Sequence, residues 1–202
     1  MKTGGVVLCG GRSSRMGHPK AWLPFGDETL LQRTVRVLSD VVHPVIVVAA
    51  PGQDVPELPA DVAIIRDEVE GRGPLVGLAA GLAALQGIVE AVYLSACDVP
   101  FLKPEFVRRV IELGHLTTGF AASVPKVDGY LHPLAAVYRV EVLSHVRELL
   151  ALNRLRTAGL FDVVPTRIIE PHELAEADPD LRSLRNVNTP EEYEAALREL
   201  RQ

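Results

Sequence analysis

The first residues of this chain that could do chemistry form a turn rich in glycine and basic side chains. Gly10 and Gly11 are followed by Arg12, Arg15 and Lys20. Adjacent glycines let the backbone turn tightly and present N–H groups to a ligand, and arginine and lysine neutralise phosphate charge. A polyphosphate needs both, so the turn predicts a phosphate-binding loop. The alternative is a glycine-rich turn with solvated arginines.

This turn matches neither of two familiar phosphate loops. The dinucleotide pattern G-x-G-x-x-G does not fit, because Gly10 and Gly11 are adjacent and no third glycine is correctly spaced. The P-loop does not fit either, because Gly17 precedes a His-Pro-Lys run instead of Lys followed by Ser or Thr. We therefore expect a different kind of phosphate loop.

Two acidic residues follow later apolar runs. Asp67 comes after residues 62–65, and Asp98 comes after residues 92–96 in a turn that ends at Pro100. Ligands of open α/β sheets bind beyond the carboxyl ends of the strands, and Mg²⁺ bound to nucleotides takes one or two carboxylates. Asp98 is therefore a candidate Mg²⁺ ligand. Taken singly, it also fits a turn or a helix cap.

A third candidate element is the start of a helix. Gly73 and Pro74 stand at its head, which leaves the N-terminus of the helix open to close contact with a ligand. Gly77 and Gly81 follow, and they fit either that site or close packing of the helix on the sheet.

The elements that must position these residues alternate along the chain. Short β-branched runs and longer amphipathic stretches predict a Rossmann-like α/β fold, a mostly parallel sheet flanked by helices on both faces. The expected strands span residues 5–8, 45–49, 62–65, 92–96, 120–124, 133–138 and 163–169, and the expected helices span residues 30–38, 75–85, 105–113, 140–150 and 191–200. Thr189, Pro190 and Glu192 form a capping box at the start of the last helix. Residues 1–202 are expected to form one domain, with a nucleotide half at about 1–115 and an acceptor half at about 116–202.

Composition narrows the class of protein. The chain has 202 residues, 48% of them hydrophobic, and a net charge of −5, which argues against nucleic-acid binding. No apolar stretch approaches the roughly 20 residues that cross a bilayer, and we expect no secretory leader. Cys9 and Cys97 lack metal-ligand spacing. A cytoplasmic protein with reduced thiols, no nucleic-acid partner and no membrane contact is expected.

Four motifs in order resemble one family, the molybdenum cofactor guanylyltransferases, or MobA-like members of the nucleotidyltransferase superfamily. The loop from Leu8 to Lys20 resembles their L-A-G-G-x-S-x-R-M-G-x-x-K signature, and the other three resemble G-P-L-x-G-[LM], C-D-x-P and N-[VI]-N-T-P-E-[ED]. In this chain the three are Gly73-Pro74-Leu75-Val76-Gly77-Leu78, Cys97-Asp98-Val99-Pro100 and Asn186-Val187-Asn188-Thr189-Pro190-Glu191-Glu192. The resemblance implies a nucleotide-diphospho-sugar transferase type of fold and transfer of GMP from GTP to molybdopterin.

The resemblance also implies roles for single residues. The backbone of Leu8, Cys9 and Gly10 would lie against guanine, with Gly11 in the same loop. Lys20 would bind the GTP phosphates with Arg15 nearby, Asp67 would help to hold the nucleotide, and Asp98 would coordinate Mg²⁺. The catalytic set is then Lys20, Arg15 and Asp98. GTP and molybdopterin are the expected small-molecule partners, with transient contacts to proteins that deliver the pterin or mature molybdoenzymes.

The chain departs from the family pattern in two places. Cys9 replaces the usual alanine and adds a thiol close to the expected base. The asparagine that the family often has after the second strand is absent, because that region reads Val48-Ala49-Ala50-Pro51. A polar contact to the nucleotide is therefore missing or supplied from elsewhere.

The acceptor is expected to lie across the cleft from the nucleotide. His132, Asn186 and Asn188 are the candidate contacts for the pterin, and the alternative is that all three only organise turns. A thiol catalyst is disfavoured because no histidine is evidently paired with Cys9. Two rival functions remain: a cytidylyltransferase acting on molybdopterin or a sugar or polyol phosphate, and a non-catalytic module that binds GTP.

Overall fold

A mostly parallel sheet forms the centre of the molecule. The computed structural model describes residues 1–10, 16–66, 73–116 and 119–201. The strand order is β10-β7-β9-β6-β1-β4-β5, with β8 paired to β7 outside this path. The strands are β1 (Thr3–Leu8), β4 (Val45–Ala49), β5 (Ala63–Arg66), β6 (Ala91–Ala96), β7 (Ala122–Val127), β8 (Tyr130–Leu131), β9 (Ala135–Arg139) and β10 (Thr166–Ile169). Pairs β1–β4, β1–β6, β4–β5 and β7–β10 are parallel, whereas β9 runs antiparallel to β6 and β7.

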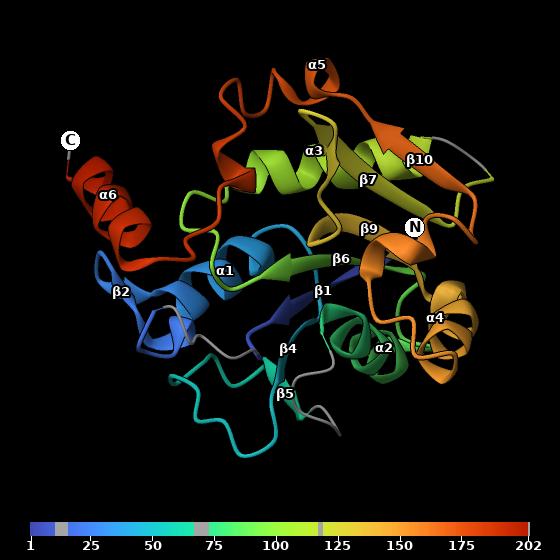
Figure 1. The fold of residues 1–202 in the computed structure, drawn as a ribbon, viewed down its shortest axis with the longest axis horizontal. Coiled ribbons are helices and arrows are strands. Elements are labelled where there is room, and N and C mark those ends of the chain that lie inside the picture. Colours follow the sequence, from blue (N-terminus) through green and yellow to red (C-terminus); the bar gives the residue numbers. More distant parts are fainter. Residues whose placement is uncertain (11–15, 67–72, 117–118, 202) are drawn as a thin grey trace.

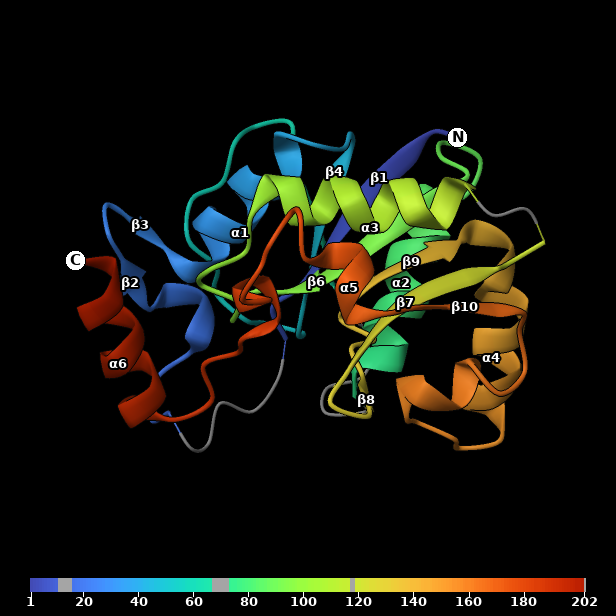
Figure 2. The ribbon, with the colours of Figure 1, turned by 90° about the horizontal axis from the view of Figure 1, so that it is seen from above.

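Helices cover both faces of this sheet, as predicted. Figure 1 shows α1 (Leu30–Ser39) and α3 (Pro104–Leu116) on one side and α2 (Pro74–Leu85) and α4 (Leu143–Ala151) on the other. Figures 1 and 2 both place α6 (Pro190–Leu200) at one end of the molecule, beside the hairpin of β2 (Pro24–Phe25) and β3 (Glu28–Thr29). The remaining short elements are α5 (Pro171–Leu174) and the 3-10 turns Lys20–Trp22, Val140–Val142, Thr157–Leu160 and Arg182–Leu184.

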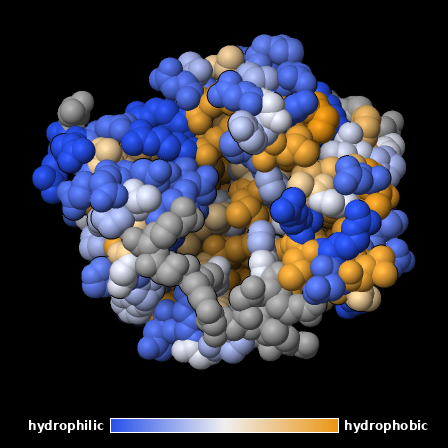
Figure 3. All heavy atoms as spheres, viewed as in Figure 1, coloured by the Kyte–Doolittle hydropathy of each residue, from blue (hydrophilic) through white to orange (hydrophobic). Residues whose placement is uncertain are grey.

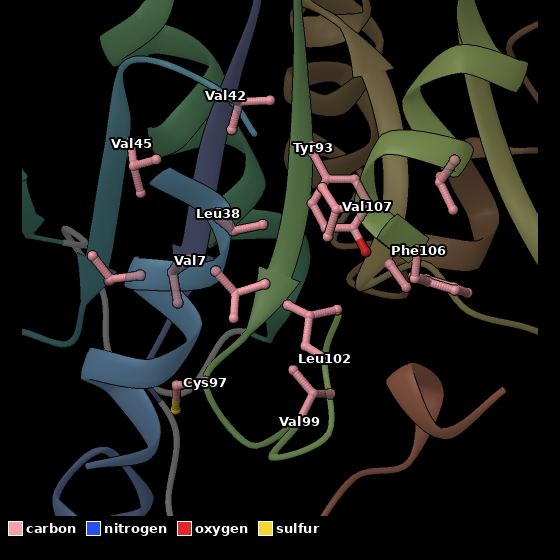
Figure 4. Close-up of a cluster of buried hydrophobic side chains, with 14 of the residues drawn as sticks. Val7, Leu38, Val42, Val45, Tyr93, Cys97, Val99, Leu102, Phe106 and Val107 are labelled. Carbon is pink, nitrogen blue, oxygen red and sulfur yellow. The ribbon is translucent and has the colours of Figure 1, made fainter. Parts of the chain in front are cut away.

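Alternating side chains of β1 belong to two hydrophobic clusters, one on each face of the sheet. Val7 belongs to the cluster with α1 and α3, whereas Val6 and Leu8 belong to the cluster with α2 and α4. Figure 4 shows side chains of the first cluster, among them Leu38 from α1 and Phe106 from α3, gathered about β1 and β6. A side chain of this size contributes roughly 1.5–3 kcal/mol when fully buried. Packing on both faces of the sheet therefore fixes the carboxyl ends of β1 and β6.

Two glycines of α2 allow the helix to approach β1 closely. A Cβ at Gly77 would lie 2.9 Å from Leu8 Cδ2, and one at Gly81 would lie 2.7 Å from Val6 Cγ1. Of the two roles expected for these glycines, close packing of the helix on the sheet is confirmed. Larger residues there would push α2 away from the strand whose end carries the Gly-rich turn.

Several boundaries differ from those predicted. β9 begins at Ala135 instead of residue 133, because Pro133 has no N–H to donate and the Ala135 N–H closes a turn onto His132 O. β10 begins at Thr166 because the N–H groups of Val163 and Val164 turn back to Leu160 O. The two-residue strands β2, β3 and β8 are too short to give a periodic signal. The predicted capping box of Thr189 and Glu192 is confirmed.

No helix among the described residues has the length and apolar sequence needed to cross a membrane.

Candidate active site

An ion pair stands where β6 ends. Lys20 Nζ lies 2.5 Å from Asp98 Oδ2, and the two side chains are 17% and 13% exposed. Lys20 belongs to the 3-10 turn that follows the Gly-rich loop, and Asp98 follows Ala96, the last residue of β6. The structure thus brings together two predicted catalytic residues that are 78 positions apart.

Two asparagines from the C-terminal part of the chain complete this cluster. Asn186 Nδ2 donates to Asp98 Oδ1 at 2.8 Å, and Lys20 Nζ donates to Asn188 Oδ1 at 2.8 Å. Both asparagines were expected to contact the acceptor from the opposite half of the cleft. The structure places them in direct contact with Asp98 and Lys20, the predicted nucleotide-binding pair, and their contact with the acceptor stays a prediction.

The segment that carries these asparagines is fixed at both ends. Val187 N donates to Asp98 O at 2.9 Å, and Thr189 caps the helix that follows. Upstream, the guanidinium groups of Arg182 and Arg185 lie 4.2 Å and 5.2 Å from the centre of the Phe101 ring. Cation–π contacts of this kind stabilise by about 0.5–2 kcal/mol. The loop after β6 and the segment before α6 therefore hold one another in place.

The end of β1 forms the neighbouring wall. Cys9 N donates to Val48 O at 3.0 Å and Leu8 O accepts from Cys97 N at 3.1 Å, so the sheet ladder extends past the last residue of β1. Figure 3 shows a hollow with an apolar floor in the middle of the face viewed, where β1 and β6 end in Figure 1. A nucleotide placed against Leu8, Cys9 and Gly10 would enter this hollow.

The Cys9 thiol is not set up for catalysis. Burial raises its pKa to about 11, although Arg66 acts in the opposite direction. A thiol with this pKa is protonated at neutral pH and is a poor nucleophile. The expectation that Cys9 acts through its backbone and not its sulfur agrees with this environment.

Three predicted site residues, Gly11, Arg15 and Asp67, lie outside the described residues. Their predicted roles in binding GTP, and the catalytic role of Arg15, stay predictions.

His132 lies at the same edge of the sheet, but its hydrogen-bond partners are not members of the Asp98 cluster. It precedes β9, whose first residue Ala135 pairs with Ser95 near the carboxyl end of β6. Its N–H donates to Pro125 O at 2.9 Å, and burial lowers the pKa of its imidazole while Asp128 opposes this. Within the described chain no hydrogen bond joins it to Lys20 or Asp98, and its predicted contact with the acceptor stays a prediction.

The donor set at Asp98 suits a metal ion that arrives with a nucleotide. Asp98 Oδ2 and Asn188 Oδ1 both lie within hydrogen-bond distance of the Lys20 ammonium, so two protein oxygens face one cation. Residues 1–10, 16–66, 73–116 and 119–201 contain no group of three or more His, Cys, Asp or Glu residues that could hold a metal. Mg²⁺ at such a site takes one or two carboxylates and fills its shell with phosphate oxygens and water. These residues fit that arrangement and do not form a cage built by the protein alone.

Comparison with known proteins decides the family. A model described as "MobA-like NTP transferase domain" matches residues 5–162. The chain is 38% identical over 205 residues to the "Probable molybdenum cofactor guanylyltransferase" of Mycobacterium avium, covering 100% of this chain and 96% of that protein. The chain belongs to the MobA-like NTP transferase family. It is a nucleotidyltransferase, as the motifs predicted.

Further relatives agree. The protein of the same name from Mycobacterium tuberculosis (strain H37Rv) is 38% identical over 189 residues, covering 92% of this chain and 88% of that protein. The fold matches the crystal structure of molybdopterin-guanine dinucleotide biosynthesis protein A from Archaeoglobus fulgidus with a TM-score of 0.81 at 21% identity, covering 97% of each chain. It also matches 2-C-methyl-D-erythritol 4-phosphate cytidylyltransferase from Thermus thermophilus with a TM-score of 0.70 at 19% identity, covering 98% of each chain. These two likenesses concern the fold alone.

Sequence reasoning missed one residue that the structure places at this edge. Gln53 lies in the loop after β4, and its side chain reaches back to Cys9. The absence of a polar side chain at residues 48–51 was the one signal that pointed to this loop.

Proposed function

We propose that this nucleotidyltransferase transfers GMP from GTP to the terminal phosphate of molybdopterin and releases pyrophosphate. The observation that carries the proposal is the cluster of Lys20, Asp98, Asn186 and Asn188 at the carboxyl ends of β1 and β6. The names of the curated relatives supply the substrates.

The reaction is an in-line displacement at the α-phosphorus. A phosphate oxygen of the acceptor forms the new bond, and the bond to the pyrophosphate oxygen breaks. An existing phosphate monoester is already anionic, so no general base has to remove a proton. Catalysis then depends on positioning and on neutralising charge, which agrees with the ion pair and the two amides among the described residues of the site and with a protonated Cys9 thiol.

Each described residue has a role in this scheme. Lys20 would bind the triphosphate and offset the charge that grows on the leaving pyrophosphate. Asp98, with Asn188 beside it, would hold Mg²⁺, which when bound supplies further neutralisation of the phosphates. Asn186 holds one carboxylate oxygen of Asp98 and so fixes the direction of the other. Arg15 would assist Lys20, and Asp67 would help to hold the nucleotide.

The acceptor half of the proposal depends on His132. It lies at the edge where β9 begins, beside the end of β6, and its partly buried imidazole is biased towards the neutral form by burial. A neutral imidazole both donates and accepts hydrogen bonds, which suits the polar edge of a pterin. Contacts with proteins that deliver the pterin or receive the product complete the expected set of partners.

A panel of nucleotides tests the proposal. Purified protein is given Mg²⁺, one acceptor (molybdopterin, a sugar phosphate or a polyol phosphate) and GTP, CTP, ATP or UTP in turn, and released pyrophosphate is measured. We expect release with GTP, loss of release when the metal is chelated, and little release with the other three. A preference for CTP would overturn the choice of guanine, and release only with a sugar or polyol phosphate would overturn the acceptor. Binding of GTP without any release would indicate a non-catalytic module.

A further inference from the structure

One side chain ties the end of β1 to the loop after β4. Gln53 Oε1 accepts from Ala50 N at 3.0 Å, and Gln53 Nε2 donates to Cys9 O at 2.9 Å. The same nitrogen lies 4.0 Å from Cys9 Sγ. Both ends of one primary amide are therefore bonded to main-chain groups of the residues that directly follow β1 and β4, which are neighbours in the sheet.

A second side chain holds this loop from the other direction. Arg66, the last residue of β5, pairs with Ala49 in the β4–β5 ladder. Its guanidinium donates to Ala50 O at 3.3 Å and to Gln53 O. The backbone around Gln53 is thus fixed by a group outside the loop, which limits the directions in which its amide can point.

The two backbones also touch with nothing between them. A Cβ at Gly10 would lie 3.1 Å from Ala50 N, so the chain beyond β1 passes directly against the loop. At this place the two backbones lie against each other, and the amide of Gln53 is hydrogen-bonded to both of them.

The Cys9 carbonyl is the group whose direction matters. The N–H of the same residue is not available to a ligand, because Cys9 N donates to Val48 O at 3.0 Å. A carbonyl oxygen has two lone pairs, so the bond from Gln53 leaves one acceptor position, fixed in direction. Guanine carries N–H donors on its N1 and N2 atoms, whereas N1 of adenine presents a lone pair. A fixed acceptor therefore favours guanine and repels adenine, since a site built to bind an N–H rejects the analogue that lacks it.

We propose that Gln53 is a positioning residue for base preference, which acts by holding the Cys9 carbonyl in place for the nucleobase. This inference rests on the proposed function, which puts guanine against Leu8, Cys9 and Gly10. Gln53 itself need not touch the base.

The test compares two variants of Gln53 with matched variants of Gln32. Gln53→Ala removes both contacts, and Gln53→Glu keeps an oxygen for Ala50 N–H but removes the donor to Cys9 O. Gln32, on α1, makes a comparable bridge to another part of the same loop. Its Oε1 accepts from Thr29 N and its Nε2 donates to Glu57 O, both at 2.9 Å. Gln32→Ala and Gln32→Glu therefore control for loop anchoring alone.

The measurement is the dissociation constant of each full-length protein for GTP, ATP, CTP and UTP with Mg²⁺ and without acceptor, together with the melting temperature. We expect both Gln53 variants to bind GTP about tenfold more weakly, the effect of one lost hydrogen bond to a polar group. ATP binding should change by less, so the GTP-to-ATP preference falls. The Gln32 variants should keep that preference whatever happens to their melting temperature.

The outcomes separate this inference from the proposed function. Folded Gln53 variants with an unchanged base preference would overturn the inference and leave guanylyl transfer standing. A wild-type protein that prefers another base would overturn guanylyl transfer, and a loss of that preference in the Gln53 variants would still support a positioning role. Preference kept in Gln53→Glu but lost in Gln53→Ala would assign the effect to the Ala50 contact and overturn the role through Cys9. A wild-type protein that binds no nucleotide would overturn both.

Discussion

Two lysine–aspartate pairs among the described residues have similar distances and different surroundings. Lys20 and Asp98 lie 2.5 Å apart with both side chains partly exposed, at 17% and 13%. Lys103 and Asp178 lie 2.8 Å apart, but Asp178 is fully buried while Lys103 is 41% exposed. Residue types and distance alone do not separate them.

The remaining partners of the two carboxylates explain the difference. Asp178 Oδ2 accepts from the backbone N–H of Ser183 at 2.7 Å, which pins the segment leading to the asparagines onto the start of α3. Asp98 is bonded by the side chains of Lys20 and Asn186, which can exchange partners when a ligand arrives. A carboxylate bound by backbone is a structural anchor, whereas one bound by side chains at the edge of a hollow is available to a ligand.

The largest expected effect is on turnover when the side chain of Lys20 is removed. Lys20→Ala should lower kcat about 100- to 1000-fold, the usual effect of losing one group that stabilises transition-state charge. Its free energy of unfolding should fall by only about 1 kcal/mol. Lys103→Ala is the matched control and should keep kcat within about twofold, since its side chain contacts Asp178 and not the site. Turnover that is equally low in both variants would remove the distinction between the pairs.

Loss of the Asp98 charge should have a similar but smaller effect on turnover. Asp98→Asn keeps the size of the side chain and loses its charge, so we expect kcat to fall about 100-fold with little change in melting temperature. The loss should be partly relieved by raising the Mg²⁺ concentration, because a weaker ligand still contributes an oxygen. Steady-state pyrophosphate release over a Mg²⁺ series measures both quantities. A variant that unfolds instead of losing turnover would class Asp98 with Asp178.

Loss of the buried Asp178 charge should lower the free energy of unfolding. Asp178→Asn leaves Lys103 without its ion-pair partner and weakens the bond to Ser183 N, so we expect about 2 kcal/mol less stability. Denaturant unfolding of the wild type and the variant gives this value. Below its melting temperature the variant should keep kcat within about tenfold. A loss of turnover as large as that of Asp98→Asn would contradict the structural role.

The smallest expected effect sharpens the comparison by pH. Burial alone would raise the pKa of Asp178, but hydrogen bonds from Lys103 and Ser183 outweigh it and hold the pKa below its ordinary value. The folded state therefore binds fewer protons at this site than the unfolded state. The pair stabilises the fold above the ordinary aspartate pKa of about 4, and that contribution is lost as the pH falls through the lower folded-state pKa.

Thermal unfolding at several pH values checks this expectation. The difference in stability between the wild type and Asp178→Asn should be constant from about pH 7 to pH 5 and should shrink below about pH 4. When Lys103→Ala is introduced into both proteins, this difference in stability should become smaller over the same pH range. A difference that stays constant down to about pH 3 would show that Asp178 does not act through its charge.

The sequence by itself determined the local features of this protein. Continuous β-branched runs such as Val45-Ile46-Val47-Val48 predicted buried parallel strands, and Thr189 with Glu192 predicted the start of the last helix, because these signals lie within a few neighbouring residues. The order of four motifs predicted the family, which the relatives confirm. The predicted first residues of β9 and β10 were less accurate, because the turns at Pro133 and after Leu160 determine where these strands begin.

Only the tertiary structure decided how the site is assembled. No local signal in the sequence predicts that Asn186 contacts Asp98, 88 positions away, or that Asn188 contacts Lys20, 168 positions away. Gln53 belongs to no recognised motif and reaches Cys9 because β1 and β4 are neighbours in the sheet. Spacing along a chain reports local geometry, whereas contacts between distant segments depend on how strands and helices pack. For the same reason, Asp98 and Asp178 look alike in sequence and differ only in burial and in the partners that packing brings to each.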